Sequence, residues 1–137
     1  IKGNFVLDGE LLAGVDNEPK TFNDLQQRLN KKAPTEKFIE TNPCFIKVYD
    51  VLFFDGIDLR DKPLVERRKV LNSYFSTNRS PLFLSETIKF RDWKFLDEIR
   101  DVSDNQIHEG VMIKSVSSLY IAGRPRGKWF KWKFSKK

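Results

Sequence analysis

Residues 4–13 read Asn-Phe-Val-Leu-Asp-Gly-Glu-Leu-Leu-Ala, an apolar stretch that carries two acids around a glycine. We predict a β-strand here, whose apolar members are Phe5, Leu7, Leu11 and Leu12. Successive side chains of a strand point to opposite faces, so Asp8 and Glu10 share one face. Carboxylates on a concave sheet face suit a sugar hydroxyl or a metal ion, because burying them alone is costly. A half-exposed strand with a polar, solvent-facing edge explains the same pattern.

A second charged strand is predicted over Glu109–Val116 and begins Glu-Gly-Val-Met-Ile-Lys. Its alternation places Glu109 on one face, and Gly110 and Lys114 on the other. The glycine would let a flat ligand or another backbone come close. An ordinary core strand with charged ends is the alternative interpretation.

A third strand is predicted over Lys128–Phe134, where basic and aromatic residues alternate. Lys131 and Lys133 fall on one face, and the aromatic side chains on the opposite face are expected to anchor the strand in the core: Phe130, Trp132 and Phe134. Two adjacent ammonium groups repel each other, and a polyanion such as a triphosphate would relieve that repulsion. A half-exposed strand with basic outward positions fits the pattern as well.

The rest of the chain alternates between helices and strands. Further strands are expected at Phe45–Phe54, before an Asp55-Gly56 turn, and at Leu82–Ile88. Helices are expected after Thr21, over Pro34–Thr41, from Pro63 (with Leu64, Val65, Arg68 and Leu71 on one side) and after Asp92. The uneven spacing and hairpin-like joins favour an α+β fold, a curved and mostly antiparallel sheet with helices packed outside.

Composition limits the class of protein. The 137 residues are enough for one domain, and 39% hydrophobic with 32% charged residues is typical of a soluble globular chain. A net charge of +6 favours anionic partners such as nucleotides or nucleic acid, although many basic surfaces bind neither. The one cysteine, Cys44, excludes an internal disulfide, and no stretch is long enough to span a membrane.

Together these motifs resemble those of the covalent nucleotidyltransferases, above all the ATP-dependent DNA ligases. The shared order is a DGE strand, an aromatic-Asp strand, an EGxxxK strand and a Lys-x-Lys strand. They occur here as Asp8-Gly9-Glu10, Tyr49-Asp50, Glu109-Gly110…Lys114 and Lys131…Lys133. The Trp-Phe-Lys-Trp-Lys ending is most similar to a group of bacterial ligases associated with DNA repair.

The resemblance implies a role for two residues of the first strands. Glu10 would hydrogen-bond the ribose of ATP, and Tyr49 would stack on the adenine. Tyr49 as an ordinary core aromatic remains the alternative. Asp8 receives no ligand-binding role and is expected to be structural.

The resemblance also implies how the phosphates and a metal would be held. Glu109 would help to bind Mg²⁺, which prefers oxygen ligands. Lys131 and Lys133 would bind the phosphates and stabilise charge as pyrophosphate leaves. Lys114 would lie near the α-phosphate.

The chain departs from the family pattern at both ends. A Lys-x-Asp-Gly motif, whose lysine accepts AMP, is expected before the DGE strand, and an OB-fold domain after the Lys-x-Lys strand. We therefore expect residues 1–137 to be part of an ATP-grasp-like adenylation domain that performs no covalent step alone. The parent enzyme would be a monomeric cytosolic ligase that uses ATP and Mg²⁺ to seal nicked double-stranded DNA. The alternatives are an RNA ligase and a non-catalytic nucleic-acid-binding module.

Overall fold

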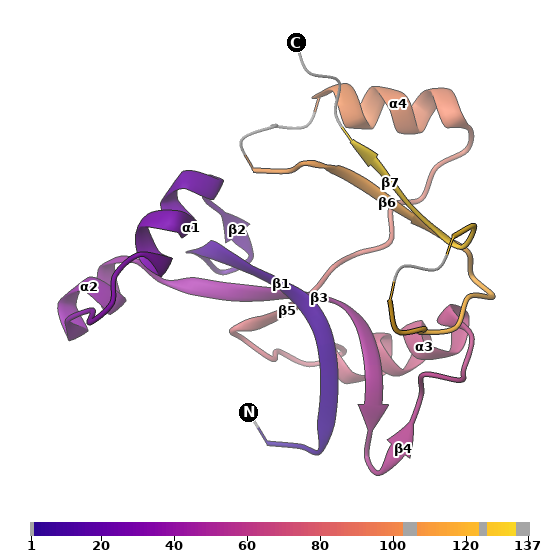
Figure 1. Ribbon diagram of the computed structural model, residues 1–137, viewed down its shortest axis with the longest axis horizontal. Helices are drawn as coiled ribbons and strands as arrows, with labels where there is room; N and C mark the ends of the chain where they lie inside the picture. Colours follow the sequence, from indigo (N-terminus) through magenta and orange to yellow (C-terminus); the bar gives the residue numbers. More distant parts are fainter. Residues whose placement is uncertain (1, 103–106, 124–125, 134–137) are drawn as a thin grey trace.

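The chain folds into a five-stranded sheet, a separate two-stranded sheet and four helices, within the residues that the computed structural model describes (2–102, 107–123 and 126–133; Figure 1). The larger sheet has the order β2-β1-β3-β4, and β5 pairs with β3 in parallel. Its strands are β1 (Phe5–Val15), β2 (Glu18–Pro19), β3 (Cys44–Phe54), β4 (Ile57–Asp58) and β5 (Leu82–Leu84). The predicted α+β class is confirmed, but the strands form two sheets instead of one.

The centre of the larger sheet is a long antiparallel ribbon of β1 and β3, which curves strongly (Figure 1). Its register changes between Asp8, which pairs with Asp50, and Gly9, which pairs with Val48. Tyr49 is therefore the extra residue of a β-bulge. Bulges increase local twist and redirect a side chain, and this one lies between the two acids of the DGE motif.

The core lies where α3 (Leu64–Tyr74) packs on β3. It is built from aliphatic side chains that are almost fully buried: Val48, Val51, Leu59, Leu71 and Leu82. The aspartate-glycine turn after β3 occurs as predicted, and both of its residues have positive φ, 49° at Asp55 and 84° at Gly56. Such a turn joins β3 to β4 with the twist that a tight hairpin requires.

The buried side of α3 differs from the prediction at one position. Val65 was placed on the same side as Leu64 and Leu71 but is 45% exposed, whereas Arg67 is fully buried. The buried positions Leu64, Arg67, Leu71 and Tyr74 follow the three-and-four spacing of one helix face. An arginine can occupy this face because Asp50 of β3 neutralises it.

Two short helices, α1 (Phe22–Leu29) and α2 (Glu36–Thr41), follow the first hairpin. The predicted helix start at Thr21 is confirmed, and Thr21 caps α1 in a capping box with Asp24. The second helix was expected to open at Pro34, but Thr35 is its N-cap, because its hydroxyl accepts a hydrogen bond from the Phe38 amide. None of the described helices is long and apolar enough to cross a bilayer.

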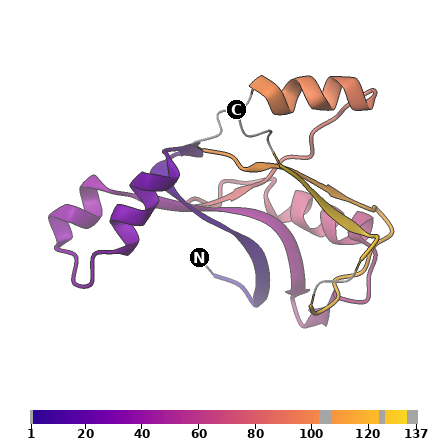
Figure 2. The ribbon, with the colours of Figure 1, turned by 45° about the horizontal axis from the view of Figure 1, so that its top comes forward.

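The second sheet consists of β6 (Gly110–Lys114) and β7 (Trp129–Lys133), and we call it the lysine hairpin. The helix α4 (Trp93–Val102), which Asp92 caps as predicted, and the β1–β3 ribbon lie on opposite sides of this hairpin (Figure 2). On the helix side, Trp132 contacts Trp93 with ring centroids 6.4 Å apart. It also lies under the Arg100 guanidinium, 4.9 Å from the ring centroid.

Several predicted strand ends were too long. The fifth strand ends at Leu84 instead of Ile88, and β6 ends at Lys114 instead of Val116, which turns away to solvent. The predicted anchor Phe130 is wrong, because its side chain is 55% exposed; only the Trp132 end of this face is covered by α4. Phe134, another predicted anchor, lies outside the described residues.

Replacing Arg67 by methionine is expected to destabilise the fold strongly, because Asp50 would remain as an unpaired buried carboxylate. Loss of one partner of a buried ion pair costs about 3–5 kcal/mol. Urea unfolding followed by tryptophan fluorescence measures this free energy. The control is Arg60→Met, which breaks the solvent-exposed pair with Asp58 and should leave the midpoint almost unchanged. Equal effects of the two substitutions would contradict the prediction.

Candidate nucleotide-binding site

The acidic end of the site is carried by β1. Gly9 lies so close to β3 that a Cβ atom there would meet the Lys47 carbonyl oxygen at 2.5 Å. The absence of a side chain at Gly9 thus allows β1 to pair closely with β3 at this point. Asp8 and Glu10 flank the glycine in the sequence. The carboxylate of Asp8 accepts a hydrogen bond of 2.6 Å from the Tyr120 hydroxyl, whereas Glu10 is exposed. Only Glu10 is therefore freely available to a ligand.

Tyr49 lies beside these two acids because the bulge redirects it. Its side chain is partly buried, and this burial raises the pKa of its phenol. The negative charges of Asp8 and Glu10 raise the pKa of the Tyr49 phenol further. The phenol thus stays neutral at physiological pH, and its ring forms part of the wall between the acids and the lysine hairpin.

Lys114 connects the two sheets. Its ammonium nitrogen lies 4.8 Å from the ring centroid of Tyr49 and 4.2 Å from that of Trp129. Cations are attracted to the faces of aromatic rings at such distances. Burial lowers the pKa of Lys114, and the carboxylates of Asp50 and Asp8 act in the opposite direction. The cation is held between an aromatic ring of β3 and one of β7.

Glu109, just before β6, and Lys131 of β7 form an ion pair whose side chains are both largely exposed. The hydrogen bond from Lys131 lowers the pKa of Glu109, so its carboxylate is ionised at neutral pH. Lys131 pairs with Met112, and Lys133 with Gly110, in the hairpin register. Both lysines are exposed, and they lie on the face that also carries Lys114.

The position of Gly110 in the lysine hairpin requires a glycine. Its φ is +153°, and a Cβ atom would meet the Trp132 carbonyl oxygen at 2.1 Å. The glycine of the EGxxxK motif is therefore needed for close strand pairing. This is the backbone alternative that the sequence allowed for this residue, and no ligand has to be invoked to explain it.

Sequence reasoning assigned no role to Tyr120, Trp129 or Arg67. The alternation that placed Lys131 and Lys133 together also places Trp129 on their face, so this residue could have been found. Tyr120 and Arg67 gave no comparable signal, because their partners Asp8 and Asp50 are distant in the chain.

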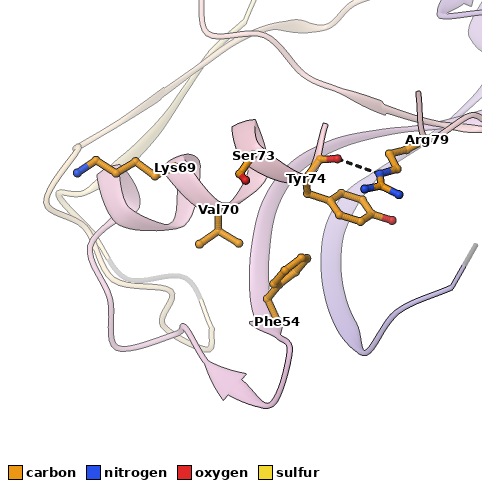
Figure 3. A pocket seen from close by; sticks show the side chains of 6 residues that line it. All are labelled: Phe54, Lys69, Val70, Ser73, Tyr74 and Arg79. Carbon is orange, nitrogen blue, oxygen red and sulfur yellow. Dashed lines mark hydrogen bonds between the residues drawn. The ribbon is translucent and has the colours of Figure 1, made fainter. Parts of the chain in front are cut away.

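One hollow lies elsewhere, beside α3 and the end of β3 (Figure 3). It is lined by Phe54, Lys69, Val70, Ser73, Tyr74 and Arg79. No residue of the predicted site contributes to it. The candidate site is instead an open arrangement of side chains from β1, β3 and the lysine hairpin.

The family described as ATP dependent DNA ligase domain matches residues 1–133. The chain belongs to this family. DNA ligases from Methanothrix thermoacetophila and Archaeoglobus fulgidus are each 34% identical to this ligase domain, over 93% and 97% of it. A probable DNA ligase from Pseudarthrobacter chlorophenolicus is 39% identical over 93% of it. The chain spans 23–24% of the length of these relatives.

A solved structure has the same fold. The crystal structure of the ligase domain of LigD from M. tuberculosis superposes with a TM-score of 0.67 at 25% identity. The match covers 94% of this ligase domain and 37% of the LigD chain. The predicted resemblance to ATP-dependent DNA ligases is thereby confirmed, while the roles of individual residues and the closer relation to bacterial repair ligases stay predictions.

The contact between Tyr120 and Asp8 predicts an unusual tyrosine titration. Burial, followed by the hydrogen bond and the charge of Asp8, raises the pKa of the Tyr120 phenol. Asp8→Asn should lower this pKa towards the ordinary value of about 10, without reaching it, because burial persists. Tyrosinate absorbance at high pH measures the change, and Tyr120→Phe identifies which transition belongs to this residue.

The same group should make stability depend on pH. Because the folded pKa of Tyr120 is above the unfolded value of about 10, its contribution is complete below that pH and is lost as pH rises through the folded pKa. The free energy of unfolding should fall more steeply above pH 10 in the unmodified protein than in Tyr120→Phe. Parallel profiles would contradict the raised pKa.

Proposed function

We propose that this chain forms the ATP-holding part of the adenylation domain of an ATP-dependent DNA ligase. The parent enzyme would seal 5′-phosphate/3′-hydroxyl nicks through enzyme–AMP and DNA–AMP intermediates. The observation that carries this proposal is Lys114 held between Tyr49 and Trp129. It brings the lysine hairpin against β3, the strand paired with the acidic strand β1, so that one nucleotide could contact both sheets. The family match over residues 1–133 supports the same assignment.

The nucleoside would be bound by the larger sheet. Glu10 is exposed and would accept hydrogen bonds from the ribose hydroxyls. Tyr49 is neutral and partly exposed and would stack on the adenine. Asp8 is already bonded to Tyr120, which supports the structural role expected for it.

The phosphates would be bound by the lysine hairpin. Lys131 and Lys133 are exposed on one face, and a triphosphate between them would relieve their mutual repulsion. Their ammonium groups would stabilise the charge that develops as pyrophosphate leaves. Lys114 lies nearer to Tyr49 and would meet the α-phosphate.

Glu109 is the residue that would hold Mg²⁺. Among the described residues, no group of three or more His, Cys, Asp or Glu side chains could hold a metal alone. One ionised carboxylate nevertheless fits an ion that takes its other ligands from water and phosphate oxygens. When bound, Mg²⁺ would neutralise phosphate charge next to Lys131, with which Glu109 is already paired.

The group that accepts AMP is proposed to come from the parent protein. No Lys-x-Asp-Gly occurs in the 137 residues, and the chain spans about a quarter of the relatives' length. The proposed substrate of the complete enzyme is nicked double-stranded DNA, since the cited relatives are named DNA ligases. We propose that the enzyme acts as a monomer in the cytoplasm. Competition between nicked DNA and nicked RNA for the complete enzyme distinguishes it from an RNA ligase.

The chain by itself should not become adenylated. Incubation with ATP labelled at the α-phosphate and with Mg²⁺ should leave no AMP on the protein, because the nucleophilic lysine motif is missing. Intact mass spectrometry detects the adduct directly. A stable AMP adduct, mapped to any lysine of this chain, would contradict the prediction.

Removal of either hairpin lysine should weaken binding of ATP but not of adenosine. A hydrogen bond to a charged group contributes about 1.5–3 kcal/mol, so Lys131→Ala or Lys133→Ala should raise the Kd for ATP about tenfold or more. NMR titration with each ligand measures the two constants. Lys69→Ala removes an exposed lysine from α3 and is the matched control. If the control weakens ATP binding equally, binding depends on net charge, as in a non-specific nucleic-acid-binding module.

A further inference from the structure

The two halves of the proposed site are not joined by strand pairing. Glu10 and Tyr49 belong to the five-stranded sheet, whereas Lys114, Lys131 and Lys133 belong to the lysine hairpin, which forms a sheet of its own. Hydrogen bonds between strands therefore do not set the distance between nucleoside-binding and phosphate-binding residues. Contacts made by side chains and loops must set it.

The segment that follows β6 fastens the hairpin to the start of α3. The N-cap of this helix is Pro63, which provides no side-chain hydrogen bond. The carbonyls of Ser118 and Val116 accept hydrogen bonds from the Leu64 and Val65 amides, at 2.8 and 3.0 Å. These are donors that the first turn of a helix leaves unpaired. A loop more than fifty positions away thus supplies the cap that the local sequence lacks.

Tyr120 then connects this loop to the acidic strand. Its amide donates to the Arg60 carbonyl at 3.0 Å, and its hydroxyl donates to the Asp8 carboxylate at 2.6 Å. Its ring meets Trp129 edge to face, with centroids 5.5 Å apart. Trp129 has a second contact with the same loop, because its indole nitrogen donates a hydrogen bond to the Ser118 hydroxyl at 2.9 Å.

We propose that Tyr120 is a positioning residue that sets the lysine hairpin at the correct distance from Glu10 and Tyr49. Its hydroxyl fixes the loop to β1, and its ring fixes Trp129, against which Lys114 rests. A hydroxyl bonded to a carboxylate is among the stronger and more directional hydrogen bonds. The effect of this role on nucleotide binding rests on the proposed function, since only a ligand that contacts both sheets requires a fixed spacing between them.

The nucleotide test compares two ligands in Tyr120→Phe, which removes only the hydroxyl. Adenosine would contact the larger sheet alone, so its Kd should stay within about twofold. The Kd for ATP should rise about tenfold, because binding must then order a hairpin that the Tyr120 hydroxyl no longer holds in place. Asp8→Asn combined with Tyr120→Phe should cause little further loss, because both changes remove the same contact. Equal weakening of adenosine and ATP would overturn the proposal, since a general loss of structure affects both.

A second measurement needs no nucleotide. The nuclear Overhauser effect between the Tyr49 ring and the Lys114 side chain reports the distance between the two sheets. It should weaken or disappear in Tyr120→Phe and persist in Tyr74→Phe. The second variant is a matched control, because the Tyr74 hydroxyl is buried and has no hydrogen-bond partner among the described residues.

The outcomes separate the two proposals. An Overhauser effect that is unchanged in Tyr120→Phe overturns the positioning role, whatever ATP does. If the unmodified chain binds neither adenosine nor ATP, the proposed nucleotide site fails in this chain, and the Overhauser effect still decides the role of Tyr120.

Discussion

The carboxylate of Asp50 and the guanidinium of Arg67 are both fully buried, and they form two hydrogen bonds with each other, of 2.8 and 3.1 Å. Neither charge could be held in the core without the other. Arg67 also donates to the carbonyls of Lys62 and Ser118, at 2.7 and 2.9 Å. One side chain of α3 therefore ties together the central strand, the approach to its own helix and the loop of the lysine hairpin. The candidate site depends on this group, because it holds the two sheets against the same helix.

In this arrangement several charged side chains have partners within the fold, while others remain exposed. Asp50 and Asp8 are occupied by Arg67 and Tyr120, so these carboxylates serve the fold. Glu10 remains exposed. Among the cations, Lys114 rests against two aromatic rings, and the nearby carboxylates of Asp50 and Asp8 already have partners of their own. A phosphate group would therefore meet a positive charge that is already in place, and such preorganisation is what electrostatic catalysis requires.

Membership of the ATP-dependent DNA ligase domain family and the open shape of the site are consistent with each other. The structural match includes 94% of this chain but only 37% of the LigD chain. The side chains of the candidate site come from the two sheets and form one open surface. An adenylating site also needs a nucleophile opposite the leaving pyrophosphate, and we propose that a residue of the parent protein fills that role.

The amino-acid sequence by itself determined the longer elements and much of the chemistry of their faces, but not the two-residue strands β2 and β4. Period-two alternation was enough to place Asp8 with Glu10 and Lys131 with Lys133, and capping residues marked α1 and α4, because these signals depend only on near neighbours. The sequence could not show that the strands divide into two sheets, that Arg67 is buried instead of Val65, or that Tyr120 reaches Asp8. Each of these depends on contacts between residues far apart in the chain. Only the tertiary structure decided them, because burial of a charged or polar side chain becomes favourable only after its distant partner is in place.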